Sequence, residues 1–152
     1  MARINPVKMI WAARILIGTV LFFNVQCALQ FIFWPGAFVS GFELSGVAGL
    51  AALQGMGILF LMWNVPYLTA LMNPMRQRTS LVEAVCMQAL GAGGETLLGL
   101  ALPVGHAVLA ASIQRFIVFD TGGLLCLLAA WGLVWRCLVL NARAHPGKMP
   151  VI

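Results

Sequence analysis

Eight polar or charged residues lie within, or directly beside, long apolar stretches of this sequence. They are Gln26, Gln30, Glu43, Gln54, Glu95, His106, Arg115 and Asp120. Carboxylates and histidine can exchange protons, and amides and arginine can hold the polar groups of a ligand. Because polar groups are costly inside apolar segments, they usually face the interior of a helix bundle or a cavity. We therefore take these eight residues as the candidate ligand-binding set, and we assign none of them a catalytic role.

The spacing within this set predicts two relationships. Glu95 and Arg115 stand at similar distances from the short segment around Pro103 and Gly105, so we expect them to form an ion pair. Arg115 and Asp120 are five residues apart, which places them about 140° from one another around a helix and makes a local pair unfavourable. We expect Asp120 to face Gln26, Gln30, Gln54 or a ligand.

Cysteine and histidine are sparse and poorly spaced for metal or redox chemistry. Cys27, Cys86, Cys126 and Cys137 contain no C-x-x-C pair, which is the spacing typical of thiol oxidoreductases. We expect the two histidines, His106 and His145, at opposite faces of the membrane, where they cannot join one set of ligands for zinc or haem. We predict structural thiols, no metal and no cofactor.

The amino-acid composition indicates whether this chain folds in water or in a membrane. Of its 152 residues, 62% are hydrophobic and 9% are charged, against roughly 45–50% and about 25% in soluble domains. The nine Lys and Arg residues do not form the basic surface that a nucleic-acid-binding domain needs. A soluble globular domain, a disordered chain and a nucleic acid partner are therefore excluded, and an integral membrane protein remains.

The apolar stretches predict an all-α, four-helix transmembrane bundle, since about 20 apolar residues cross a bilayer as a helix. We expect a single integral membrane domain over residues 1–152, with helices near 9–34, 46–72, 80–102 and 107–140. Pro66 predicts a bend in the second helix, because proline lacks the backbone N–H of an interior helical residue. The last helix is longer than a bilayer requires.

Basic residues predict the orientation. Eight of the nine Lys and Arg residues fall on one side of an up-and-down bundle, and three of the four acidic residues fall on the other. Because Lys and Arg favour the cytoplasmic side, we expect both termini to be cytoplasmic and the polar set to lie toward the outer face. Short loops and the lack of an organellar targeting segment favour a bacterial cytoplasmic (inner) membrane.

The opening helix carries a family resemblance. The run Ala13-Arg14-Ile15-Leu16-Ile17-Gly18, followed by Leu21-Phe22-Phe23, resembles the first helix of the DoxX-like proteins, which are small four-helix bacterial membrane proteins. The resemblance implies a compact bundle that is often the partner of a larger membrane redox or export system. It transfers no catalytic residue to this chain.

Three functions fit these observations, beside a purely structural role in which the polar groups hold the helices together. The leading hypothesis is a non-enzymatic accessory or ligand-binding subunit with an outer-facing polar cavity for a lipid, a quinone or a small polar molecule. The alternatives are a small oligomeric transporter or proton-coupled carrier, and an intramembrane enzyme acting on a lipid or isoprenoid. The expected partners are membrane lipids, together with a second copy of the chain or a larger membrane complex.

Overall fold

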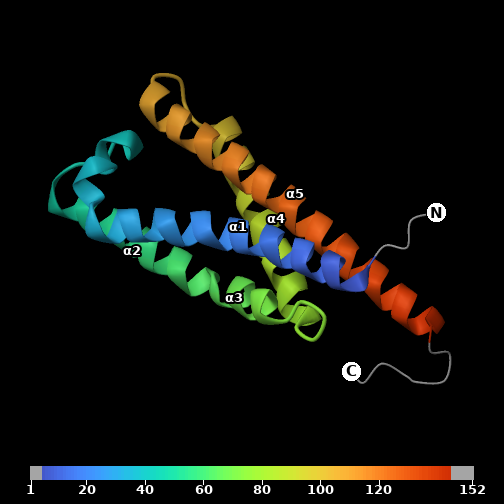
Figure 1. Cartoon of the computed structure of the whole chain (residues 1–152). Helices are drawn as coiled ribbons and strands as arrows, with labels where there is room; N and C mark the ends of the chain where they lie inside the picture. The colour runs from blue at the N-terminus through green and yellow to red at the C-terminus, as the bar shows by residue number, and fades with distance from the viewer. Residues whose placement is uncertain (1–4, 145–152) are drawn as a thin grey trace.

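The computed structural model describes residues 5–144, and over this range the ordered elements are helices (Figure 1). Arg3 and Lys148, which were counted in the charge distribution, and His145 lie outside the described residues. The elements are α1 (Pro6–Phe33), the short 3₁₀ helices η1 (Pro35–Ala37) and η2 (Val39–Phe42), α2 (Gly46–Trp63), α3 (Val65–Met72), α4 (Arg78–Ala101) and α5 (Ala107–Ala144). Four segments are long and apolar enough to span a membrane, with α2 and α3 together forming the second. The prediction of an all-α fold with four helices that could span a membrane is confirmed.

Three helices extend beyond their predicted limits, among them α4, which begins at Arg78 rather than near residue 80. The first begins at Pro6 because the side chain of Asn5 accepts a hydrogen bond from the Val7 N–H at 3.0 Å, and because proline fits the first turn. The last continues to Ala144, since the sequence contains neither glycine nor proline between Gly132 and Pro146.

The second span is broken at Asn64, as Pro66 predicts. The Asn64 N–H donates to the Leu61 carbonyl at 3.1 Å instead of bonding one residue further back. The carbonyl of Phe60 is thereby freed, and the Asn64 side chain satisfies it through Nδ2 at 2.6 Å. After the break, α3 packs against both α1 and α4, whereas α2 packs along α1.

The packed core occupies the half of the bundle that contains the start of α1 and the end of α5. Small alanines and larger aliphatic residues interlock there, which lets the helices approach closely. The cluster comprises Ala13, Ile17, Val20, Tyr67, Ala70, Leu81, Ala84, Leu127, Ala130 and Val134. Toward the other end, α1 and α5 diverge (Figure 1).

The two ends of the bundle differ in charge. The start of α1 and the end of α5 lie at the same end (Figure 1), where the Cys137 thiol donates to the Pro6 carbonyl at 3.6 Å. We call it the basic end, because it holds Lys8, Arg14, Arg76, Arg78, Arg136 and Arg143. We call the other end, with η1, η2 and the α4–α5 turn, the open end. That the basic end faces the cytoplasm stays a prediction.

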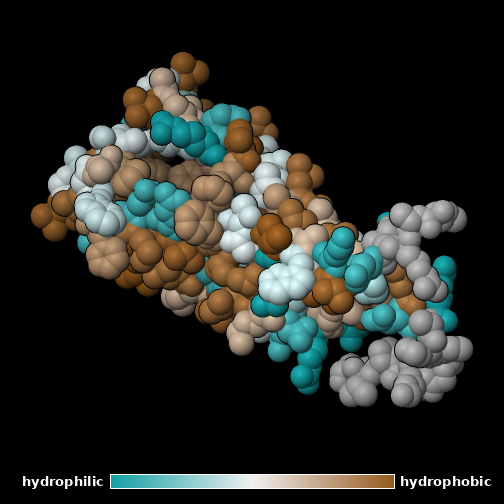
Figure 2. Space-filling model, in the orientation of Figure 1, coloured by the Kyte–Doolittle hydropathy of each residue, from teal (hydrophilic) through white to brown (hydrophobic). Residues whose placement is uncertain are grey.

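The outward faces of the spans are apolar. Phe22, Leu90, Leu97 and Val118 are all more than half exposed, and hydrophobic atoms cover much of the face in Figure 2. Such a surface suits a hydrocarbon solvent, in which outward apolar side chains need no further cover.

Candidate functional site

A cavity of about 80 Å³ lies in the middle of the bundle, where every span contributes to its lining. We call it the inner cavity. Its polar lining consists of Asn24 on α1, Asn64 at the break, Tyr67 on α3, Gln88 and Glu95 on α4, and Asp120 on α5. The site therefore depends on all four spans being assembled.

A chain of hydrogen bonds crosses one wall of the inner cavity. The Tyr67 hydroxyl donates to Gln88 Oε1 at 2.7 Å, and Gln88 Nε2 donates to Asp120 Oδ1 at 2.8 Å. Tyr67 and Gln88 are each 3% exposed. Since buried polar side chains are stable only when they are hydrogen-bonded, this chain fixes α3, α4 and α5 relative to one another.

Two glycines make room for this chain. A Cβ atom at Gly91 would collide with the carboxylate of Asp120, and a Cβ atom at Gly123 would lie 2.7 Å from Gln88 Nε2. Neither position tolerates a larger residue unless the polar side chain opposite moves. The close approach of α4 and α5 and the polar wall are therefore parts of one arrangement.

A larger pocket of about 410 Å³ adjoins the inner cavity toward the open end. We call it the outer pocket. Cys27, Phe116 and Phe119 line both spaces, so the two are neighbours along the same path. Figure 2 shows a hollow between the η1–η2 segment and the outer part of α5. The path thus opens at the surface on the open end.

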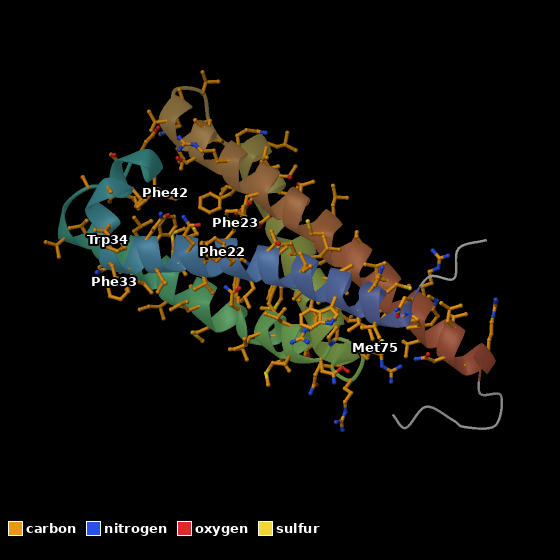
Figure 3. The ribbon with its side chains drawn as sticks, viewed as in Figure 1. Phe22, Phe23, Phe33, Trp34, Phe42 and Met75 are labelled. Atoms are coloured by element: carbon orange, nitrogen blue, oxygen red, sulfur yellow. The ribbon has the colours of Figure 1, made fainter. Side chains whose placement is uncertain are left out.

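Phenylalanine rings form the walls of the outer pocket. The ring centroid of the buried Phe31 lies 5.5 Å from that of Phe38, 5.6 Å from Phe42 and 6.2 Å from Phe116. Figure 3 shows Phe42 on the side of η2 that faces the bundle, whereas Phe33 and Trp34 point away from it. Such a wall suits an apolar or aromatic body.

A second polar contact ties η2 to the start of α5. Glu43 Oε2 lies 2.5 Å from His106 Nδ1, and Glu43 Oε1 accepts the Leu109 N–H at 3.2 Å. These two hydrogen bonds, that of His106 first, hold the pKa of Glu43 below its usual value. Ser112 Oγ also donates to the Gly41 carbonyl at 2.6 Å. The edge of the outer pocket is therefore fastened at two points.

The structure distributes the predicted set over several places. Glu95 and Asp120 line the inner cavity, Gln30 and Arg115 line the outer pocket, and Glu43 and His106 form the contact at its edge. The remaining two, Gln26 and Gln54, are exposed and line neither space. Gln54 Nε2 donates instead to the Ile32 carbonyl at 3.0 Å.

The predicted ion pair between Glu95 and Arg115 is wrong. Arg115 Nε donates to the Ala111 carbonyl on its own helix at 3.3 Å, and Glu95 Oε2 is buried without a hydrogen-bond partner. Their depths match, but Arg115 is turned to the outer pocket while Glu95 is turned to the inner cavity. The partner of Asp120 is likewise Gln88 rather than one of the three glutamines expected.

Four polar residues of the inner cavity were not predicted, namely Asn24, Asn64, Tyr67 and Gln88. The sequence prediction favoured charged residues and the outer half of each span, whereas these four side chains are uncharged. A helical stripe would have indicated Gln88, because it lies three residues before Gly91 and seven before Glu95 on one face of α4.

Between residues 5 and 144 the four cysteine thiols are free, and no three His, Cys, Asp or Glu side chains come together as metal ligands. Comparison of the chain with protein-family models, with curated proteins and with solved structures finds no match. The resemblance of the first helix to the DoxX-like proteins therefore stays a prediction.

Proposed function

We propose that this protein is a non-enzymatic membrane subunit that binds a small amphipathic molecule between its helices. The ligand class is that of a lipid, a quinone or a small polar molecule with an apolar body. One observation supports this most: two buried oxygens without partners, Asn64 Oδ1 and Glu95 Oε2, belong to the lining of a cavity that continues into an aromatic pocket.

Unsatisfied buried polar atoms are uncommon, because each costs about 1–3 kcal/mol of desolvation that no hydrogen bond returns. A ligand or water in the inner cavity removes that cost. The outer pocket, at about 410 Å³, falls within the roughly 300–1,000 Å³ of small-molecule sites. The polar group of the ligand would lie deep, with its apolar part among the phenylalanines.

The orientation of the site is part of the proposal. If the basic end faces the cytoplasm, as the distribution of Lys and Arg favours, the outer pocket opens toward the outer face of a bacterial inner membrane. The packed core then closes the basic half below the inner cavity. This closure favours binding from one side over transport through a single copy of the chain.

The surroundings of the protein belong to the same proposal. The apolar surface would be covered by membrane lipids, by a second copy of the chain or by a larger membrane complex that the bound molecule serves. The polar wall of Tyr67, Gln88 and Asp120 is engaged in structural hydrogen bonds, which favours binding over acid–base catalysis by Asp120.

Native mass spectrometry of gently solubilised protein tests this function. We expect the full chain to retain a molecule of defined mass. Cys27→Trp, which fills the passage between the two spaces, should lose it. Cys86→Trp is the matched control, because Cys86 is exposed on α4 and lines neither space. A ligand-free wild-type species that occurs only together with another subunit would instead indicate a structural role.

A further inference from the structure

The floor of the inner cavity has buried hydrogen-bond acceptors without donors. Asn64 is 5% exposed, and its Nδ2 donates to the Phe60 carbonyl. The Phe60 carbonyl oxygen can only accept a hydrogen bond, so the side-chain nitrogen of Asn64, and not its oxygen, must face it. Its Oδ1 consequently has no partner, and Glu95 Oε2 in the same lining has none either.

The donors around this floor are largely engaged already. Tyr67 has one hydroxyl proton, directed to Gln88, and Gln88 Nε2 is directed to Asp120. The remaining polar groups of the lining are the amide of Asn24, which offers both a donor and an acceptor, the indole N–H of Trp63, and the thiol of Cys27, a weak donor. None of these groups donates to Asn64 Oδ1 or Glu95 Oε2, which have no partner. The positions left to fill are therefore positions for a hydrogen-bond donor.

The carboxyl groups of the lining have no basic partner among the described residues. Glu95 on α4 and Asp120 on α5 face the inner cavity, and no Lys, Arg or His among residues 5–144 belongs to its lining. Arg115 belongs to the outer pocket and bonds within its own helix. A carboxylate taken out of water without a cationic partner is costly, so a positively charged ligand group would be stabilised here.

Aromatic rings complete the environment of the inner cavity. Phe60, Trp63, Phe116 and Phe119 belong to its lining, and the Phe60 centroid lies 6.3 Å from that of Trp63 and 6.2 Å from that of Phe116. Ring faces attract a cation within about 6 Å of their centroid. The rings therefore favour the same ligand charge as the carboxylates.

We propose that the inner cavity binds the ammonium group of a small protonated primary amine, whose apolar body occupies the outer pocket. An ammonium group has three donors and no acceptor, so it supplies both the missing donors and the missing positive charge. A quinone carbonyl would bring a further acceptor to a floor that lacks donors. This inference rests on the proposed function and narrows its ligand class to an amine.

A matched series of probes tests the inference on the purified full chain. Phenethylamine has both charge and N–H donors; phenethyltrimethylammonium has charge alone; 2-phenylethanol has a neutral donor; 3-phenylpropionate has the opposite charge. In titration calorimetry at neutral pH we expect phenethylamine to bind at least tenfold more tightly than each of the others. Equal or tighter binding of the alcohol or the carboxylate overturns the inference.

Variants locate the binding. Glu95→Gln should weaken phenethylamine at least tenfold while changing 2-phenylethanol less than threefold, because the amide keeps the size of the side chain and loses its charge. Glu83→Gln is the matched control, since Glu83 is exposed on the basic half of α4. Unchanged phenethylamine affinity in Glu95→Gln overturns the assignment, and the wild-type probe series does not depend on the folding of any variant.

The inference and the proposed function fail separately. A native ligand lost on Cys27→Trp, together with no preference for phenethylamine, refutes the amine and leaves the binding function intact. Absence of a native ligand together with absence of binding by every probe refutes both.

Discussion

Near the basic end, Ala13, Ala70, Ala84 and Ala130 are fully buried between the helices, and Leu127 and other aliphatic side chains fill the space among them. Near the open end, the same spans meet through phenylalanine rings instead, and a pocket of about 410 Å³ remains between them. Buried oxygens without partners occur where the two regions adjoin.

This difference follows from the break in the second span. Because the helix bends at Asn64 and Pro66, α3 packs against α1 and α4 and completes the apolar core, whereas α2 stays with α1. Gly57 permits the close contact between α2 and α1, since a Cβ atom at this position would lie 2.7 Å from the Ala28 carbonyl. A single bend thus separates a region built for packing from one with room for a ligand.

Removing volume from the packed region should have the largest effect. Leu127 is fully buried, so Leu127→Ala should lower the free energy of unfolding by about 2–5 kcal/mol. Phe42→Ala should cost less, because it only enlarges a pocket that is already open. Thermal unfolding of the two variants in the same detergent measures the contrast, and equal losses would contradict the distinction between the regions.

The polar wall should be the next most sensitive part. Gly123→Ala brings a methyl group against Gln88, and we expect it to cost about 1–3 kcal/mol. The neighbouring Gly122 has open space at its Cβ position, so Gly122→Ala should be neutral or should stabilise the helix by up to about 1 kcal/mol. Chemical or thermal unfolding compares them, and similar behaviour of the two would show that the contact is dispensable.

Glu95 should matter less for stability than for binding. Glu95 lacks an ion pair and has a buried oxygen without a partner. The substitution Glu95→Gln should therefore leave the free energy of unfolding unchanged or raise it by less than about 1 kcal/mol. Arg115→Ala should behave alike. A large loss of stability in Glu95→Gln would indicate that this carboxylate has a structural partner, and it would weaken the case for a ligand-binding site.

The contact at the edge of the outer pocket should give the smallest effect, and it should depend on pH. The hydrogen bonds from His106 and from the Leu109 N–H hold the pKa of Glu43 below the usual value of a glutamate. A group whose folded pKa is depressed stabilises the folded state above its unfolded pKa, and that contribution is lost as pH falls through the folded pKa. We therefore expect the hydrogen-exchange protection of the Leu109 amide, measured relative to its intrinsic rate at each pH, to fall as the solution is made acidic enough to protonate Glu43.

Glu43→Gln supplies the control for this last prediction. An amide can still accept the Leu109 N–H but does not titrate, so the protection of the Leu109 amide should lose its acid dependence in the variant. The same acid dependence in wild type and variant would show that another group is responsible.

The sequence by itself determined the all-α class, the four helices that are long and apolar enough to span a membrane, and the bend at Pro66. Each of these depends on local quantities, namely the length of an apolar run, the spacing of charges and the missing N–H of proline. It also singled out Glu95 and Asp120, which line the inner cavity, because a carboxyl group inside an apolar span needs a special environment.

Only the tertiary structure decided which polar groups meet. Depth along the bilayer can be counted from the ends of a helix, and on that basis Glu95 and Arg115 were expected to pair. The direction in which each side chain points depends on how each helix is rotated against its neighbours, and that rotation follows from close contacts such as those of Gly91 and Gly123. For this reason Gln88, rather than Gln26, Gln30 or Gln54, is the partner of Asp120, and the cavity lies where the spans diverge.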